Sequence, residues 1–485
     1  MSFLDPSTWA GKIFNGDWVA AGGGNLDVFE PATGQVLTSV GLASVQDAHR
    51  AAKDAAEAQV AWAATKPEER AAILRKAGDL WHEHEAEIGQ WIMRETGAIP
   101  PKAGLETHMA QGICYEASAL PSHTMGSVHP SNNDHWSISR RRPAGVVSVI
   151  SPFNFPLILS IRSVAPALAL GNAVVLKPDP RTPITGGHVI ARVFEEAGLP
   201  KGLLQVIPGA ADVGVAVVEA PDVRVVSFTG STAAGRKVGE LASANLKRVH
   251  LELGGKNSII VLPGADVAKA ASAAAFGSFL HQGQICMSTG RIVVHESLYD
   301  EFVEILAGKA QHLPVGNPHT EQVALGPVID HKQLERMDSL VKATVSAGAT
   351  LVAGGTHQDL FYKPTVLTGV TKDMPAYSEE IFGPVASVFK YSTTKEAIDL
   401  VSDTEYGLSL SILGDVGIAM EIADSVPTGL VHINEQTVAD EPNIPFGGVG
   451  NSGNGSRFGG AEANIEAFTE LQWLTVRSEI APYPF

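Results

Sequence analysis

The feature that most constrains the fold is an alternation of short β-branched runs and helical patterns that begins near residue 145. The runs GVVSVIS, AVVLKP, LLQVIPG, VRVVSFTG and RVHLELGG are separated by segments with helical spacing, such as LILSIRSVAPALAL and TGGHVIARVFEEAG. Strands about 20 to 30 residues apart with a helix between them are βαβ units, which build a parallel sheet with helices on its faces. The sequence therefore predicts an α/β protein.

A second alternating block, from about 256 to 435, contains SIIVL, RIVVHESL and GPVASVFKY and predicts a second α/β domain. Two N-terminal segments with helical periodicity, 44–65 and 67–97, are expected to cover a sheet. HWSISRRRPAG and FTELQWLTVRSE alternate like edge strands but have no obvious place in either sheet. Such strands often pair across subunits, so we expect a homodimer or a homotetramer.

Length and charge narrow the class of protein. A chain of 485 residues exceeds the size of a single hydrophobic core and predicts two or three domains. Its net charge of -17 repels phosphate backbones and anionic lipid surfaces, so nucleic acid and membranes are not expected partners. The N-terminus lacks a basic region followed by an apolar run, which favours a cytoplasmic protein.

Cys114 and Cys286 are the two cysteines, and neither has a second cysteine or a histidine at metal-ligand spacing, so no metal site is expected. Cys286 lies in HQGQICMSTGR, which has neither helical nor strand periodicity and contains two nearby glycines. That pattern favours a loop lining a cleft. A lone cysteine is more often a small buried hydrophobic residue, and Cys114, in a helical region, keeps that interpretation.

Three further segments carry candidate chemistry. Glu252, at the end of a predicted strand in LELGGKN, can act as a general base, or can be a capping or ion-paired glutamate. Asn154, between aromatics and prolines in SPFNFP, can donate to a developing oxyanion, or can be a turn residue. In SFTGSTAAGR a strand breaks into a glycine-rich turn and a helix whose first N–H groups can hold a phosphate.

Read in order, seven segments carry a stronger signal than any one of them. SPFNFP, LKPDP, FTGSTAAG, LELGGK, GQIC, EEIFGP and IPFGG together resemble the NAD(P)-dependent aldehyde dehydrogenase superfamily in sequence, order and approximate spacing, across essentially the whole chain. Within that superfamily, HQGQICMSTGR and HINEQTVADEPNIPFGGVGNSGNGSRFGG are similar to the benzaldehyde and vanillin dehydrogenases. The resemblance implies oxidation of an aromatic aldehyde to the carboxylic acid with NAD(P)+, through a cysteine thiohemiacetal and a thioester.

The resemblance also implies roles for individual residues. Cys286 becomes the nucleophile, Glu252 the base and Asn154 the oxyanion donor. Lys177 corresponds to the lysine on the adenosine ribose, Glu380 to the glutamate on the nicotinamide ribose, and Phe382 to the aromatic beside that ring. Gly230 and Ser231 correspond to the start of the pyrophosphate-binding helix. The remaining residues assigned to the cofactor are Ile150, Ser151, Phe153, Pro180, Gly209, Phe228, Thr229, Leu253 and Gly254.

Pro180 is a departure from the pattern of NAD-preferring relatives, which have a glutamate three residues after the lysine. Without that carboxylate a 2'-phosphate is not repelled, so NAD is the expected cofactor and NADP use stays open.

The small-molecule aldehyde substrate is assigned from positions that face the tunnel in relatives: Phe155, Leu159, Arg162, Leu280 and Ile285. An apolar slot with one cation suits a flat aromatic ring, although Arg162 can instead form a salt bridge. An aliphatic aldehyde or semialdehyde dehydrogenase and, more remotely, a cofactor-independent thiol esterase remain alternatives. A non-catalytic homologue and the CoA-acylating branch are disfavoured, because all three catalytic candidates, including Glu252, are present.

The expected architecture comprises two doubly wound parallel-sheet domains, one Rossmann-like for the cofactor and one catalytic, plus a small β oligomerisation element. Residues 1–122 and 143–253 are assigned to the NAD(P)-binding domain and 254–447 to the catalytic domain. Residues 123–142 and 466–485 are assigned to the oligomerisation strands, and 448–465 to a connection back to the cofactor domain.

Overall fold

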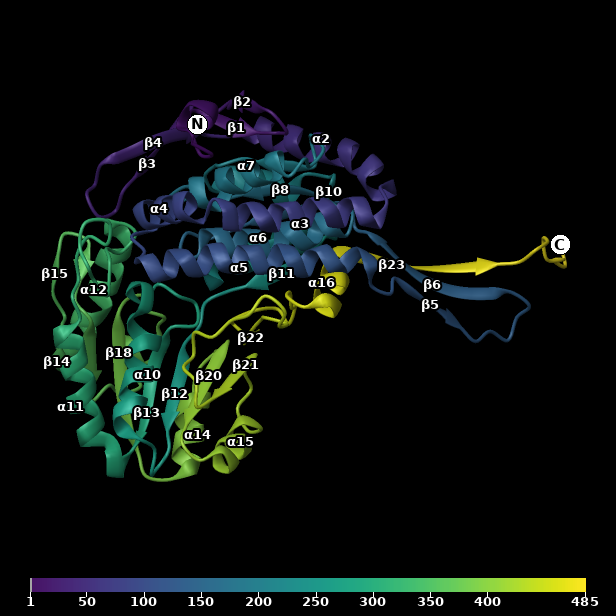
Figure 1. The fold of residues 1–485 in the computed structure, drawn as a ribbon. Helices are drawn as coiled ribbons and strands as arrows, with labels where there is room; N and C mark the ends of the chain where they lie inside the picture. Colours follow the sequence, from purple (N-terminus) through teal and green to yellow (C-terminus); the bar gives the residue numbers. More distant parts are fainter. Residues whose placement is uncertain (1) are drawn as a thin grey trace.

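The first large sheet has seven strands and forms the centre of the upper body in Figure 1. The structure is a computed structural model that describes residues 2–485. The strand order is β11-β10-β7-β8-β9-β1-β2, in which the first five strands are parallel and the last two join in antiparallel orientation. Their bounds are β1 Lys12–Phe14, β2 Trp18–Ala20, β7 Val146–Ile150, β8 Ala173–Lys177, β9 Leu204–Val206, β10 Val223–Thr229 and β11 Arg248–Glu252.

This sheet is doubly wound, as predicted. From β7 the chain proceeds outward through β8 and β9, and then returns to add β10 and β11 on the other side of β7. The connections after β7 and β10 therefore leave the same sheet edge in opposite directions and open a crevice between them. Ligands of open α/β sheets bind in such a crevice at the carboxyl ends of the strands.

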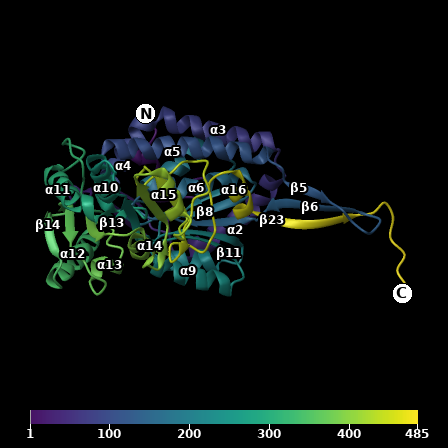
Figure 2. The ribbon, with the colours of Figure 1, turned by 90° about the horizontal axis from the view of Figure 1, so that it is seen from below.

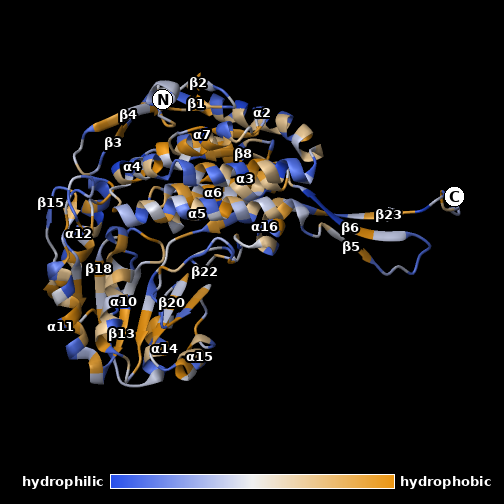
Figure 3. Cartoon of the chain, viewed as in Figure 1, coloured by the Kyte–Doolittle hydropathy of each residue, from blue (hydrophilic) through white to orange (hydrophobic). Residues whose placement is uncertain are grey.

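The second large sheet also has seven strands, in the order β14-β17-β18-β13-β12-β20-β21. All neighbours are parallel except β14 and β17. Strands β13 and β20 are coloured as strongly hydrophobic in Figure 3, which fits a sheet buried on both faces. The bounds are β12 Asn257–Val261, β13 Thr289–His295, β14 Thr350–Ala353, β17 Thr365–Thr368, β18 Val385–Tyr391, β20 Ser409–Leu413 and β21 Leu430–Ile433.

Helices cover both sheets, as the sequence predicts (Figure 1). The helical stretch 67–97 contains two helices that meet at His84, which is the C-cap of α3 and the N-cap of α4. The main helices are α2 Val45–Ala64, α3 Pro67–Glu83, α4 Glu85–Thr96, α5 Pro100–Ala119, α6 Pro156–Ala169, α7 Val189–Glu196, α8 Ala211–Glu219, α9 Thr232–Ala244, α10 Val267–Phe279, α11 Glu296–His312, α12 His331–Ser346, α14 Thr394–Ser402, α15 Val416–Ala423 and α16 Ala461–Phe468.

Shorter elements complete the body. Three strand pairs are antiparallel: β3 Asn25–Phe29 with β4 Val36–Gly41, β15 His357–Gln358 with β16 Phe361–Tyr362, and β19 Tyr406–Gly407 with β22 Val449–Gly450. The short helices are α1 Pro6–Trp9, α13 Pro375–Ser378, η1 Leu120–Ser122, η2 Ile184–His188 and η3 Leu280–Gly283. No helix formed by residues 2–485 is long and apolar enough to cross a membrane.

The two segments that had no place in either large sheet pair with each other. Strand β23 (Thr469–Val476) runs antiparallel to β6 (Trp136–Pro143), and β5 (Gly126–His129) completes a three-stranded sheet with β6 at its centre. Figures 1 and 2 show this sheet projecting from the body as an arm. We call residues 126–143 and 469–476 the β arm.

Candidate active site

Cys286 lies in the loop between η3 and β13, as the sequence predicts, and the residue is half-buried. The amide nitrogen of Asn257, at the start of β12, donates to the Cys286 carbonyl at 2.7 Å and to the Ser288 carbonyl at 3.0 Å. Gln284 accepts from the backbone N–H of Ile329 at 3.0 Å. These bonds fix the loop on both sides of the cysteine.

Glycines bring neighbouring segments into contact with this loop. A Cβ at Gly283, whose φ is +65°, would lie 2.1 Å from the Gly383 carbonyl oxygen. A Cβ at Gly255 would lie 2.4 Å from the Cys286 carbonyl oxygen. Only residues without a side chain allow such close approaches. The LELGGK segment, which begins at the end of β11 in the first sheet, therefore lies directly against the cysteine loop of the second.

Glu252 is the last residue of β11 and is buried. One of its carboxylate oxygens, Oε1, has no hydrogen-bond partner within residues 2–485. Desolvation raises the pKa of the Glu252 carboxyl to about 8, against the opposing influence of Arg162 and Arg457. A carboxylate with this pKa can accept a proton near neutral pH, which suits a general base.

Desolvation also raises the pKa of the Cys286 thiol, to about 12, and the carboxylates of Glu252, Glu380 and Asp440 act in the same direction. The thiol is therefore protonated at neutral pH and needs a base or a nearby positive charge before it can react as a thiolate. The influence of the Glu252 charge on the Cys286 pKa shows that the carboxyl lies within electrostatic reach of the thiol.

Asn154 lies four residues after β7, at the crevice edge of the first sheet, and is buried. The adjacent Phe155 ring meets the ring of His281 edge-on, at 5.5 Å between centroids, and His281 is five residues before Cys286. Asn154, Glu252 and Cys286 thus come from three separate segments that the fold brings to one region.

The residues predicted to hold the cofactor lie at the carboxyl ends of the first-sheet strands and in the segments that face them. Ser231 caps α9 by accepting from the Ala234 N–H, and the Gly230 N–H donates to the Glu252 carbonyl at 3.0 Å. The remaining first-turn N–H groups of α9 have no intrahelical partner and suit an anion. Ile150 ends β7 and Ser151 and Phe153 follow it, Phe228 and Thr229 end β10, Leu253 and Gly254 follow β11, and Gly209 precedes α8.

Glu380 and Phe382 border a small pocket together with Gly255, Lys256 and Ile285. Glu380 accepts from the Gly255 N–H at 3.0 Å, and desolvation raises the pKa of its carboxyl to about 7. Phe382 has a φ of +55°, a strained value for a non-glycine residue. Such strain often marks functional sites.

Lys177 ends β8 and is buried; its ammonium donates to the Pro178 carbonyl at 3.2 Å. The carboxylate of Asp179, two residues after Lys177, accepts three hydrogen bonds of 2.9 Å from Arg181, one from its backbone N–H and two from its guanidinium, which also donates to Asp330 at 2.9 Å. The charge of Asp179 is thereby compensated, and Pro180 adds none.

Three of the predicted substrate residues lie on or directly before α6, namely Phe155, Leu159 and Arg162, and the other two, Leu280 and Ile285, flank the start of the cysteine loop. The Arg162 guanidinium is ion-paired with Asp440 and lies 4.7 Å from the Phe446 ring centroid. Of the two roles considered for Arg162, the structure shows the salt bridge, with Arg162 buried and Asp440 half-buried; the assignment of Arg162 to the substrate slot stays a prediction.

Sequence reasoning missed several residues of this region: Lys102, Glu106, Arg181, Lys256, His281, Asp440 and Arg457. Lys256 is the last residue of the LELGGK motif; it is buried, and desolvation lowers the pKa of its ammonium to about 7. Asp440 carries no local signal, because its partner lies on α6. Lys102 and Glu106 do carry one, namely opposite charges four positions apart in a helical segment.

The chain belongs to the aldehyde dehydrogenase family: residues 18–474 match the sequence profile of that family. It is 62% identical over 486 residues to a vanillin dehydrogenase of Amycolatopsis sp., with 100% of both chains covered. It is 47% identical to a benzaldehyde dehydrogenase (NAD+) of Pseudomonas putida, with 98% of both covered. A salicylaldehyde dehydrogenase from Pseudomonas putida G7, solved in complex with salicylaldehyde, superposes with a TM-score of 0.94 at 37% identity, covering 98% of this chain and 99% of that one.

Proposed function

We propose that the protein oxidises an aromatic aldehyde to the carboxylic acid with NAD as the electron acceptor. The observation that carries the proposal is the close approach of Gly255, three residues after the buried Glu252, to the Cys286 carbonyl, together with the influence of the Glu252 charge on the Cys286 pKa. The names of the relatives, vanillin and benzaldehyde dehydrogenase, support the same reaction.

In the proposed mechanism, Glu252 accepts the Cys286 proton, and the thiolate sulfur forms a bond to the aldehyde carbon. The carbonyl π electrons move to oxygen, and Asn154 donates a hydrogen bond to the resulting oxyanion of the thiohemiacetal. Bound NAD would supply the hydride acceptor, and loss of hydride from this carbon would leave a thioester on Cys286. Glu252 releases the first proton to solvent and, again as a carboxylate, takes a proton from the water that attacks the thioester; the C–S bond breaks, Cys286 leaves as the thiolate, and the acid is released.

The cofactor assignment rests on how the residues present fit a dinucleotide. The open start of α9 suits its pyrophosphate, Lys177 and Glu380 suit its two riboses, and Phe382 offers an apolar face beside the pocket. Because Pro180 has no charge and Asp179 is paired with Arg181, little opposes the 2'-phosphate of NADP. NAD is supported by the printed name of the Pseudomonas putida relative, and NADP use is part of the test.

Aromatic substrates are favoured over semialdehydes because the charge of Arg162 is already compensated by Asp440. A semialdehyde carboxylate would have to separate that buried pair. Arg162 Nη1 and Asp440 Oδ1 are buried and have no hydrogen-bond partner within residues 2–485. A donor and an acceptor side by side suit a ring hydroxyl, so hydroxylated benzaldehydes fit best.

The domain assignments complete the proposal. Residues 1–122 and 143–253 hold the cofactor, 254–447 carry the nucleophile, and 448–465 return the chain to the cofactor domain. The segments 123–142 and 466–485, which include the β arm except for Pro143, join copies of the chain into a dimer or a tetramer. The reaction takes place in the cytoplasm.

The test measures turnover of benzaldehyde, 4-hydroxybenzaldehyde and succinic semialdehyde with NAD and with NADP, by absorbance of the reduced cofactor. The two aromatic aldehydes should turn over at least tenfold faster than the semialdehyde, and Cys286→Ala should abolish turnover while cofactor binding stays within about twofold. Turnover of the semialdehyde alone would overturn the substrate assignment. Cofactor-independent hydrolysis of 4-nitrophenyl acetate without aldehyde oxidation would favour the thiol esterase.

A further inference from the structure

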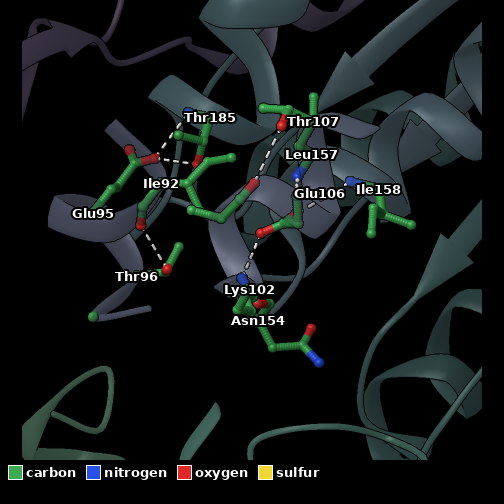
Figure 4. A network of polar contacts seen from close by, with 12 residues as sticks. Ile92, Glu95, Thr96, Lys102, Glu106, Thr107, Asn154, Leu157, Ile158 and Thr185 are labelled. Carbon is green, nitrogen blue, oxygen red and sulfur yellow. Dashed lines mark hydrogen bonds and ion pairs between the residues drawn. The ribbon is translucent and has the colours of Figure 1, made fainter. Parts of the chain in front are cut away.

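A buried ion pair on α5 contacts the backbone that carries Asn154. Lys102 and Glu106 are four positions apart on α5, form an ion pair, and have no exposed side-chain surface (Figure 4). Removing two charges from water is costly, and buried pairs are often replaceable by apolar residues without loss of stability. A contribution to the stability of the fold is therefore a weak explanation for this ion pair. Its contacts with neighbouring residues suggest a different role.

Both members of the pair bond the segment from Asn154 to Ile158. The Lys102 ammonium donates to the Asn154 carbonyl at 2.8 Å. Glu106 accepts from the backbone N–H groups of Leu157 at 3.0 Å and Ile158 at 3.3 Å, the first turn of α6. The N-cap residue of α6, Phe155, provides no side-chain acceptor, so Glu106 serves as the cap from a different helix.

The carboxamide of Asn154 depends on this support. Within residues 2–485 it makes no hydrogen bond to another protein group, and in Figure 4 it extends away from the ion pair. Its direction is therefore set by the backbone on either side, which Lys102 and Glu106 hold. Lys102 also lies 4.4 Å from the ring centroid of Phe155, and that ring contacts His281 of the segment leading to Cys286.

We propose that Lys102 and Glu106 are positioning residues that aim the Asn154 carboxamide at the oxyanion formed on the substrate. The inference rests on the proposed role of Asn154. A displacement of about 1 Å in a catalytic group can reduce a rate by about 10²-fold, so loss of the pair should act on the chemical step.

The test replaces the pair by apolar residues of similar size, Lys102→Met with Glu106→Leu, so that no unpaired charge stays buried. We expect single-turnover formation of reduced cofactor from 4-hydroxybenzaldehyde to fall 10- to 100-fold, while cofactor affinity changes less than about twofold. Deuterium at the aldehyde carbon should then slow the reaction, because hydride transfer becomes rate-limiting. Lys102→Arg, which keeps the charge and a donor, should restore at least a third of the rate.

Glu95→Gln is the matched control. Glu95 is a buried carboxylate on α4 that accepts from the N–H groups of Ile184 and Thr185, both at 2.8 Å, in a segment that carries none of the proposed site residues. Its replacement should lower the melting temperature and leave the single-turnover rate within about twofold. An equal slowing in Glu95→Gln would show that loss of any buried polar network slows the enzyme, and would overturn the inference.

Combination with Asn154→Ala separates this inference from the proposed function. If the pair acts through Asn154, its loss should slow an Asn154→Ala enzyme less than threefold further. An undiminished effect in that background, or a double variant as fast as the unmodified enzyme, would overturn the inference alone. If Asn154→Ala itself reacts at the unmodified rate, the oxyanion role of Asn154 fails, and the positioning role fails with it.

Discussion

At the residue scale, the acidic groups of the proposed site are buried, and burial raises their pKa because it disfavours the charged form. The pKa of Glu252 is raised to about 8, and only the deprotonated carboxylate can accept the Cys286 proton. We therefore expect kcat/KM for benzaldehyde to rise with pH up to about 8 and to level off above it, since kcat/KM reports the free enzyme. Steady-state rates between pH 5.5 and 9.5 measure this. A profile that is flat below pH 8 would contradict the assignment of Glu252 as base.

Glu252→Gln separates the two steps assigned to that carboxylate. Loss of a general base typically slows a step by about 10²- to 10⁴-fold. If hydrolysis of the thioester depends on it most, the first turnover should still release a burst of reduced cofactor, followed by a steady state at least 100-fold slower. Stopped-flow absorbance distinguishes the two phases. Disappearance of the burst would assign the main role of Glu252 to activation of Cys286 instead.

Pro180 makes a separate prediction about the cofactor. Its side chain brings no charge to the loop after β8, and the Asp179 carboxylate is occupied by Arg181. Pro180→Glu should add a carboxylate that accepts from ribose hydroxyls and repels a 2'-phosphate, which raises the ratio of kcat/KM with NAD to that with NADP about tenfold. The two cofactors serve as each other's control. An unchanged ratio would mean that the side chain at 180 does not face the adenosine ribose.

The sequence identified some site residues but not the residues that they contact. Cys286, Glu252 and Asn154 were predictable as candidates because each stands in a segment with a distinctive local pattern. Their partners were not, since the carboxylate that compensates Arg162 is 278 positions away along the chain. An arginine in an apolar slot and an arginine in a buried ion pair look the same in the sequence.

At the scale of elements, the cysteine loop depends on one glycine. Gly283 combines a positive φ with a predicted clash of 2.1 Å between an added Cβ and the Gly383 carbonyl oxygen. Gly283→Ala should lower the free energy of unfolding by more than about 2 kcal/mol, because neither backbone can move cheaply. It should also change the rate at which the Cys286 thiol reacts with iodoacetamide. Urea unfolding and alkylation followed by mass spectrometry measure the two effects.

Gly264→Ala controls for backbone strain alone. Gly264 also has a positive φ, +81°, but an added Cβ would meet no atom within 4 Å. Its replacement should cost about 1 kcal/mol and leave the alkylation rate unchanged. Equal destabilisation by the two substitutions would show that the contact with Gly383 contributes nothing.

Helices and strands whose apolar residues follow a clear helical or strand pattern were predicted correctly. Strands β7, β8, β10 and β11 and helix α2 lie where β-branched runs or helical spacing place them. The division of 67–97 at His84 was missed, because the helical period continues across it and the change of direction depends on packing. The N-terminus of α6 was also beyond local reasoning, since its cap comes from α5.

At the scale of the whole molecule, the β arm is the surface most suited to contact a second copy of the chain. The strand register places Val128, Ile138 and Leu474 in one row and Trp136 and Val476 beside it on the same face. Val128 and Trp136 are 64% and 66% exposed. A continuous apolar face on a projecting sheet is typical of a subunit interface.

Val128→Asp should therefore shift the protein from an oligomer towards the monomer, because a buried interface would have to accept an unpaired charge. Size-exclusion chromatography with light scattering measures the molar mass. Val60→Asp, on α2 of the body and 71% exposed, should leave the mass unchanged. A monomeric unmodified protein, or an unchanged oligomer in Val128→Asp, would rule out the arm as the interface.

The two parallel sheets could be predicted from the alternation of β-branched runs and helical segments alone. The order of seven sequence motifs then indicated the family. The arm could not be assembled in this way. The sequence indicated two edge strands without a place in either large sheet. Their pairing joins residues far apart along the chain, and local periodicity does not determine which residues face each other.

That pairing has a consequence for the order in which the protein is made. Strand β6 includes Pro143, whose partner in β23 is Thr469, so the chain between them must be synthesised before the arm can close. At about 5 to 20 residues per second, β6 waits roughly 15 to 65 s with one edge unpaired while the two large sheets are completed. If copies of the chain assemble through the arm, as we propose, assembly is restricted to chains whose catalytic segments have already left the ribosome.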